Sequence, residues 1–224
     1  MKNRFLVAYV IVALIHLVAI LLENRLVADC SKVLLIPILI GFAYQSFKKH
    51  KPVLRLLLIA LFFCWAGDTL LIFTEKNEMF FLLGLAAFLL GHIGYIFTFR
   101  KSVDTAKPAK SLPAIYYGLP IVYAVGLLIF LLPKLGDMAI PVIAYAIVIS
   151  IMCVAAMWRW SKTTKLSFMM VTTGAIIFVI SDSLIAINKF HTAISAASIL
   201  IMITYIKAQY LIVVGLKKHY FETV

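Results

Sequence analysis

Charged residues are scarce in this chain of 224 residues, at 13% of the total. A soluble domain carries about 25%, whereas hydrophobic residues here reach 64%. This balance excludes an ordinary soluble domain and predicts an integral membrane protein. Among the charged residues the acidic ones are the minority, nine Asp and Glu against 21 Lys and Arg, which gives a net charge of +12. Because the positive residues cluster in short connections between apolar runs, they indicate contact with membrane lipids, and we expect no binding to nucleic acid.

Cysteine is also rare. The three cysteines (Cys30, Cys64 and Cys153) have no paired spacing, which excludes a readable disulfide framework or zinc motif. The five histidines are scattered, without a His-Glu-x-x-His motif, and no Gly-x-Ser-x-Gly motif is present. The sequence therefore predicts neither a metal site nor a serine hydrolase, and no cofactor.

Apolar segments near the ~20 residues that a membrane-spanning helix needs follow one another along the whole chain. Eight can be marked, at residues 5–22, 33–47, 53–73, 79–97, 112–132, 139–158, 168–187 and 193–214. The second is short, and we expect it to extend into its flanks. The first lacks a small-x-small cleavage site after it and is interpreted as a retained helix. The sequence thus predicts one all-α polytopic domain over 1–224, a single bundle of about eight transmembrane helices.

The distribution of Lys and Arg predicts the orientation of these helices. With the N-terminus inside, fifteen fall in inner segments: Lys2, Arg4, Lys48, Lys49, Lys51, Arg55, Arg100, Lys101, Lys107, Lys110, Arg159, Lys162, Lys165, Lys217 and Lys218. Five fall in outer segments: Arg25, Lys32, Lys76, Lys134 and Lys189. The excess predicts that both termini are cytoplasmic. Trp158 and Trp160 flank Arg159 at an inner boundary, as an interfacial aromatic belt would.

Two carboxylates interrupt the apolar segments, Asp68 in the third and Asp182 in the seventh. An ionisable residue inside the bilayer costs about 2.5–3.5 kcal/mol on insertion scales and indicates a functional site. The sequence around Asp68 (67–71) aligns with that around Asp182 (181–185), which suggests a four-plus-four helix repeat. Each acid lies five residues before the expected end of its segment, about 7–8 Å along the helix axis. Equal depth is what two acids of one cavity would need.

Two neighbouring buried carboxylates are unlikely to be ionised together, so we expect Asp68 and Asp182 to act as a catalytic acid and base. Other polar side chains fall within reach of such a cavity. His92 and Tyr95 are spaced i, i+3, and Tyr205 and Gln209 are spaced i, i+4, so each pair shares a helix face. The candidate substrate-binding residues are His92, Tyr95, Lys189, Gln209, Lys32, Tyr205 and Ser181.

Two other functions use intramembrane acids. A proton-coupled transporter with parallel repeats is one, although its acids would be expected at the midplane. An intramembrane aspartyl protease is the other, because Ala66-Gly67-Asp68 partly matches its Gly-x-Gly-Asp motif. Ala replaces the first Gly here, and no Pro-Ala-Leu segment follows, so this motif match is weak.

Several stretches together resemble the YhhN family of multi-pass membrane proteins. They are Gly67-Asp68-Thr-Leu-Leu, Phe88-Leu-Leu-Gly-His92-Ile-Gly-Tyr95, Phe178-Val-Ile-Ser-Asp182-Ser-Leu-Ile-Ala-Ile-Asn-Lys189-Phe190 and Ala208-Gln209. The resemblance implies metal-independent hydrolysis of the vinyl ether bond of a lysophospholipid substrate, a lysoplasmalogen, to a fatty aldehyde and a glycerophospho-base. It also implies that Asp68 and Asp182 are the family's two membrane aspartates. The short, cysteine-poor chain is typical of bacteria, so we expect the bacterial inner (cytoplasmic) membrane.

Overall fold

The computed structural model describes residues 4–106 and 110–221, and within these ranges all regular structure is helical. The helices are α1 (Arg4–Leu21), α2 (Arg25–Phe47), α3 (Lys51–Leu71), α4 (Met79–Lys101), α5 (Ala114–Leu135), the 3-10 helix η1 (Gly136–Met138), α6 (Ala139–Met157), α7 (Lys165–Phe190) and α8 (Ala197–Phe221). The all-α prediction is confirmed. Lys2 and Lys107, two of the charges in the orientation count, lie outside the described residues.

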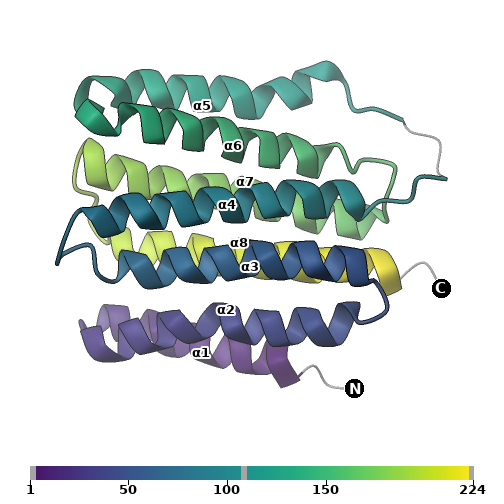
Figure 1. The fold of residues 1–224 in the computed structure, drawn as a ribbon, viewed down its shortest axis with the longest axis horizontal. Helices are drawn as coiled ribbons and strands as arrows, with labels where there is room; N and C mark the ends of the chain where they lie inside the picture. Colours follow the sequence, from purple (N-terminus) through teal and green to yellow (C-terminus); the bar gives the residue numbers. More distant parts are fainter. Residues whose placement is uncertain (1–3, 107–109, 222–224) are drawn as a thin grey trace. The chain divides into compact units, whose positions relative to one another are not determined.

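Seven helical stretches of the described chain are long and apolar enough to cross a membrane, as in a multi-pass membrane protein. One of them, Ala114–Met157, contains α5, η1 and α6. It is a hairpin, because α5 and α6 pack against each other on either side of Gly136, whose φ is +50° (Figure 1). Eight crossings and cytoplasmic termini remain predictions.

Helix α2 begins earlier than the apolar segment 33–47, and the expected extension is confirmed. Asn24 caps the helix, since its side-chain oxygen accepts a hydrogen bond from the Val27 amide at 3.1 Å, which satisfies one of the free donors of the first turn. The added turns carry Arg25 and Asp29, whose side chains lie 3.8 Å apart. This extension also brings Lys32 into the helix, which matters for the site below.

The residue contacts divide the chain into two compact units, Met1–Tyr95 and Ile96–Val224. In the first unit α1 packs on α2, and α2 on α3. Helix α4 approaches α3 through small residues, because a Cβ at Gly94 would lie 2.9 Å from Ala60 Cα. A Cβ at Gly67 would lie 2.6 Å from the Phe88 ring. Small residues allow such close contact between membrane helices.

In the second unit α6 packs on α7, and α7 packs most extensively on α8. Glycines again permit the close contact: a Cβ at Gly215 of α8 would lie 2.7 Å from the Met170 side chain of α7. At Gly174 of α7, a Cβ would lie 2.9 Å from Ile212 of α8. The prediction that residues 1–224 form one domain remains a prediction.

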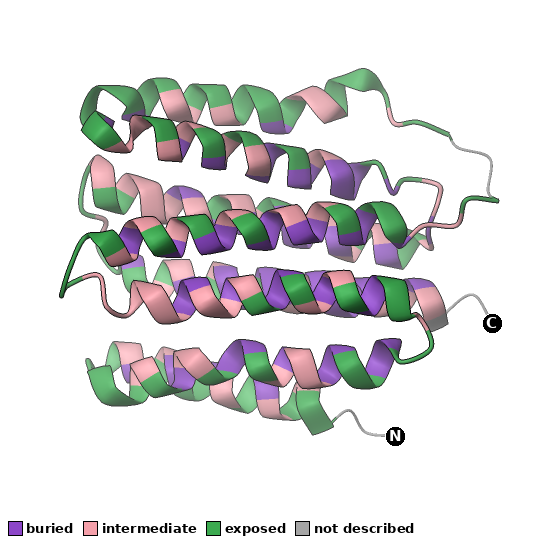
Figure 2. Cartoon of the chain, viewed as in Figure 1, coloured by how far each residue is buried: buried purple, intermediate pink, exposed green. Residues whose placement is uncertain are grey.

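Each helix has a buried face and an exposed face, and large apolar side chains are prominent on the exposed ones (Figure 2). The most exposed include Leu26, Val122 and Ile140. In water this pattern would be unfavourable, whereas lipid chains are as apolar as these side chains. The exposed faces therefore fit a bilayer environment.

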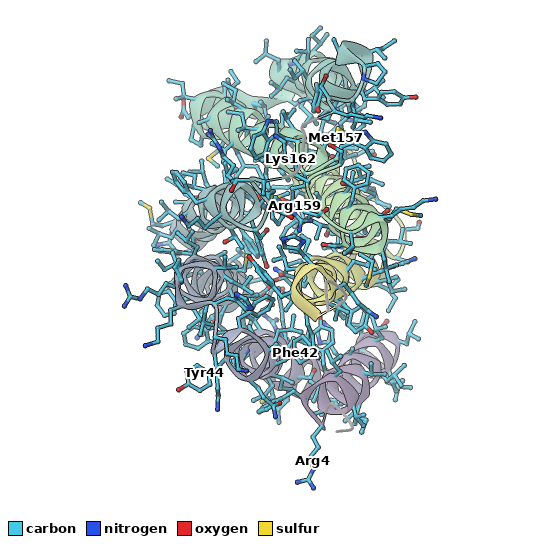
Figure 3. The ribbon with its side chains drawn as sticks, turned by 90° about the vertical axis from the view of Figure 1, so that its right-hand side faces the viewer. Arg4, Phe42, Tyr44, Met157, Arg159 and Lys162 are labelled. Atoms are coloured by element: carbon cyan, nitrogen blue, oxygen red, sulfur yellow. The ribbon has the colours of Figure 1, made fainter. Side chains whose placement is uncertain are left out.

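Arg159, in the turn between α6 and α7, is fully buried, with 0% of its surface exposed. Figure 3 shows its side chain among the helices, whereas Arg4 and Tyr44 extend outward. Its Nη2 donates to the Ser167 hydroxyl at 3.0 Å and to the Ser102 carbonyl at 3.3 Å. No carboxylate of the described ranges is seen to pair with it. Burial lowers the pKa of the Arg159 guanidinium to about 9, so this group keeps its charge at neutral pH.

The two tryptophans that flank Arg159 behave differently from it. Trp158 and Trp160 are exposed, and the Lys162 ammonium lies over the Trp158 ring, 3.0 Å from its centroid. The exposure of the rings fits the predicted interfacial belt. Arg159 itself, which the charge count places at the headgroups, instead joins α6 and α7 to the segment that follows α4.

Candidate functional site

Asp68 is buried near the end of α3, with 2% of its surface exposed. Its partner is Lys32 of α2, whose Nζ lies 3.9 Å from Asp68 Oδ1. The buried Tyr9 of α1 also interacts electrostatically with this carboxylate. Because the lysine side chain is itself only 18% exposed, the pair is shielded from solvent screening. Lys32, predicted as a substrate contact at the outer edge, lies beside the acid itself.

Trp65 fixes α3 against α2 next to this pair. Its indole Nε1 donates to the Val33 carbonyl at 3.1 Å, directly after Lys32 in the chain. The Thr69 hydroxyl donates a hydrogen bond to the Trp65 carbonyl, four residues earlier in α3, at 2.9 Å. Trp65 therefore sets the rotation of α3 that turns Asp68 toward α2.

His92 and Tyr95 of α4 are also completely buried in the first unit. Their i, i+3 spacing on an unbroken helix places them on one face, as predicted. Gly91 precedes His92, and a Cβ at Gly91 would lie 2.9 Å from the Cys64 sulfur of α3. The segment around His92 is thus packed tightly against α3, four residues before Asp68.

Asp182 of α7 belongs to the second unit, where Tyr145 of α6 is its hydrogen-bond donor. The Tyr145 hydroxyl lies 2.5 Å from Asp182 Oδ2, in the range of a strong bond to an acid. The next residue, Ser183, accepts a hydrogen bond from the Tyr123 hydroxyl of α5 at 2.9 Å and donates to the Val179 carbonyl at 2.7 Å. Two tyrosines from two helices therefore converge on the Asp182-Ser183 pair.

A small cavity of about 50 Å³ lies at this point between α5, α6 and α7. Asp182, Ser183, Tyr123 and Tyr145 line it, and most of the other lining residues are aliphatic. A carboxyl group here meets hydrocarbon on most sides. Such a cavity suits a ligand with one polar, reactive bond on an apolar chain.

The other predicted residues of the second unit fall into three settings. Ser181 is buried and donates to the Ile201 carbonyl of α8 at 3.1 Å, so it fastens α7 to α8. Gln209 and Tyr205 are buried on α8 and bonded to each other at 3.3 Å, as their i, i+4 spacing predicts. Lys189 is exposed near the end of α7, seven residues beyond Asp182.

The structure places Asp68, Lys32, His92 and Tyr95 in the first unit, and Asp182 and the remaining candidates in the second. An equal depth of Asp68 and Asp182 was expected from helix ends at residues 73 and 187. The helices end at Leu71 and Phe190 instead, three residues after one acid and eight after the other. The helix ends therefore do not support an equal depth.

Tyr145 is the residue that sequence reasoning missed. Its signal was the one tyrosine of the run 139–157, which is apolar apart from Ser150, because a buried hydroxyl needs a hydrogen-bond partner. Metal ligands are a separate question: over residues 4–106 and 110–221 no three His, Cys, Asp or Glu side chains gather in a way that would hold an ion.

Comparison with known proteins gives a consistent group of relatives. The sequence profile of the YhhN family matches residues 27–216. A lysoplasmalogenase of Mycobacterium bovis is 31% identical over 163 residues, which is 72% of this chain and 60% of the relative. Lysoplasmalogenase TMEM86B of Sus scrofa is 31% identical over 65% of this chain and 56% of its own length.

Lysoplasmalogenase TMEM86A of Homo sapiens is 29% identical over 69% of this chain and 62% of its own length. The chain thus spans about 60% of the length of the curated relatives it matches. No solved structure matches significantly.

Proposed function

The chain belongs to the YhhN family, and from this we propose that it is a membrane-embedded hydrolase of lysoplasmalogens. It would cleave the vinyl ether bond to give a fatty aldehyde and a glycerophospho-base. The observation that carries the proposal is Asp182, a carboxyl group bonded to Tyr145 on the wall of an apolar cavity. Relatives with the printed name lysoplasmalogenase supply the substrate class.

The chemistry requires a proton donor and a base. A proton is transferred to the vinyl carbon remote from the ether oxygen, the double bond breaks, and positive charge develops on the carbon bonded to oxygen. Water attacks that carbon and gives its proton to the base. In the resulting hemiacetal the C–O bond to glycerol breaks, the glycerol oxygen takes up the proton held by the base, and the hemiacetal hydroxyl gives up its proton to the other carboxylate to form the aldehyde. Positioned carboxyl groups can serve both steps, as general acid and as general base.

We assign the donor role to Asp182 and the base role to Asp68. Asp182 lines the hydrocarbon-walled cavity with Tyr145 against its Oδ2, so it meets the apolar vinyl group directly. Asp68 lies beside the Lys32 ammonium, a partner that suits an anionic carboxylate. An anion also stabilises the cationic intermediate.

Lys189 is the proposed contact for the headgroup phosphate. It lies seven residues after Asp182, and two helical turns bring residues i and i+7 to the same face about 10 Å apart along the axis. The ether bond would then lie at Asp182 and the headgroup toward the end of α7. We propose that the other candidate substrate-binding residues also contact the substrate: His92, Tyr95, Gln209, Tyr205, Ser181 and Lys32. We also propose a bacterial inner-membrane location.

The test compares purified protein on lysoplasmalogen with its plain alkyl ether and ester analogues. Only the vinyl ether substrate should release aldehyde. Asp68→Asn and Asp182→Asn should each lower kcat between about 10²- and 10⁴-fold, the usual contribution of a general acid or base. Near wild-type turnover in either variant would contradict the assignment of two acids.

Two outcomes would favour the other functions of intramembrane acids. Proton-driven uptake into vesicles without hydrolysis of any of the three lipids would favour a transporter. Peptide release from a membrane-spanning substrate would favour a protease.

A further inference from the structure

A second, larger cavity lies on the same three helices as the Asp182 cavity. Its volume is about 290 Å³, and its wall is almost entirely apolar. The residues that line it are Leu119, Pro120, Tyr123, Cys153, Met157, Ile176, Val179 and Ile180. Tyr123 and Val179 line both cavities, so the two spaces adjoin at these residues, and together they are called the groove below.

The sequence of α6 shows how the groove is built. Tyr145 and Ile149 line the Asp182 cavity, while Cys153 and Met157 line the larger one. These residues recur every four positions, so they form one stripe along the helix. The stripe extends over twelve residues, about 18 Å of helix axis. Met157 marks the end of the groove that is remote from Asp182.

The groove is polar at one end and apolar along the rest. Asp182, Ser183 and the hydroxyls of Tyr123 and Tyr145 gather at the first end. Beyond Val179 the lining is aliphatic apart from the Tyr123 ring, the Cys153 thiol and the Met157 thioether. Ile176 and Ile180 on its rim are 41% and 42% exposed, so this part is open to the bilayer from the side.

From this arrangement we propose that the groove binds the single hydrocarbon chain of the lysolipid, with its ether end at Asp182 and its methyl end toward Met157. The inference rests on the proposed function and adds where the chain lies. An amphiphile with one chain matches the polar-to-apolar sequence of the lining, and the open rim lets the chain enter sideways from the leaflet. Placing the chain here also directs the headgroup toward Lys189, on the opposite side of Asp182 along α7.

The groove then acts as a ruler for chain length. Ile176 lies six residues from Asp182, about 9 Å along α7, so a larger side chain there blocks the remote part of the groove. We expect Ile176→Trp to lower the ratio of kcat/KM for a long-chain over a short-chain lysoplasmalogen by roughly tenfold, because the indole occupies the space that the remote part of a long chain would fill. The matched control is Ile147→Trp. Ile147 is exposed on α6 and lines neither cavity, so its ratio should equal that of the wild type.

A binding measurement that needs no hydrolysis separates this inference from the proposed function. The chain has three cysteines, and Cys30→Ser, Cys64→Ala and Cys153→Ala combined with Ile176→Cys leave a single thiol, at a position that lines the groove and is 41% exposed. Its modification by a small methanethiosulfonate should slow at least tenfold with a saturating long-chain alkyl ether analogue, which cannot be hydrolysed. A short-chain analogue at the same occupancy should protect less.

The outcomes are distinct. Aldehyde release by the wild type with equal ratios in the Ile176 and Ile147 variants would overturn the groove and leave the proposed function intact, as expected if only bulk lipid chains fill this space. No aldehyde release, but chain-length-dependent protection of the thiol at position 176, would overturn the proposed function and retain the chain site. Absence of protection overturns the groove, even where Ile176→Trp does not fold.

Discussion

The Tyr145 hydroxyl donates a short hydrogen bond of 2.5 Å to the Asp182 carboxyl group. Tyr145→Phe removes the donor and keeps the ring. We expect kcat/KM for aldehyde release to fall by about 10- to 150-fold, because a hydrogen bond to a charged or charge-developing group contributes about 1.5–3 kcal/mol. The assay is aldehyde release from lysoplasmalogen. Tyr44→Phe is the control, since Tyr44 is exposed and extends outward (Figure 3), and equal rates in the two variants would contradict a role for Tyr145.

Lys32 and Asp68 give a prediction about stability at the same scale. Lys32→Met leaves the buried Asp68 carboxylate without its ammonium, and removing one partner of a buried pair costs about 3 kcal/mol. The thermal unfolding temperature in detergent should fall accordingly. Adding Asp68→Asn should restore most of the loss, because the carboxylate that Lys32 faces is then neutral.

The control for this pair is Arg25→Met. Arg25 contacts Glu75 at the exposed start of α2, and surface pairs contribute little, so this variant should unfold like the wild type. A double variant no more stable than Lys32→Met alone would show that the pairing is not what stabilises α2 on α3.

Individual residues were predictable to different degrees. Asp68 and Asp182 were found because a carboxylate in an apolar segment is conspicuous in any single sequence. The pairing of Tyr205 with Gln209 follows from helical spacing, and the contact is present. Tyr145 was not found, because its contact with Asp182 joins helices 37 positions apart, and sequence spacing does not specify how two helices are rotated toward each other.

At the scale of elements, the contact between α3 and α4 depends on glycine. Gly94→Ala would place a Cβ 2.9 Å from the Ala60 backbone and side chain, so the helices must separate. We expect a loss of about 1–3 kcal/mol of stability, the usual cost of overpacking. Gly126→Ala of α5 has no atom within 4 Å of the new Cβ and should leave stability unchanged or slightly raised. Equal thermal unfolding temperatures in the two variants would show that α3 and α4 are not tightly packed at Gly94.

The existence of the helices was predictable, whereas their ends were not. Hydropathy locates the apolar part of a helix, but α2 begins eight residues before it because Asn24 caps a polar first turn. Helix α7 similarly begins after Thr164, whose side chain accepts from the Ser167 amide at 3.2 Å. Capping and ion pairs extend helices through residues that a hydropathy average rejects.

At the scale of the whole molecule, orientation in the membrane is the open prediction. The test uses a chain whose three cysteines are replaced and which carries either Glu78→Cys or Thr105→Cys. Glu78 lies in the connection before α4, and Thr105 in the connection after it. A membrane-impermeant maleimide should label the first in intact cells and the second only after permeabilisation, because the Lys and Arg excess places the second in the cytoplasm. The opposite pattern would invert the proposed topology.

The two units share a local arrangement around their acids, whereas the four-plus-four repeat remains a prediction. In the first, the acid of α3 is paired with a side chain of α2; in the second, the acid of α7 is bonded to a side chain of α6. Each acid-bearing helix also contacts the following helix through glycine, Gly94 in α4 and Gly215 in α8. The aligned sequences at 67–71 and 181–185 indicated that the two acids are counterparts, but not which side chains contact them.

The burial of Arg159 separates two roles of its charge, one before the helices pack and one after. The Lys and Arg excess predicts that the loop between α6 and α7 is cytoplasmic, and on that prediction Arg159 contributes to the charge that orients the loop before α6 and α7 pack. Once the helices have packed, the same group is fully buried and bonded to Ser102 and Ser167, and lipid headgroups no longer meet it. The same guanidinium thus has a predicted role in orienting the chain and, in the folded protein, a structural role in holding α6 and α7 together.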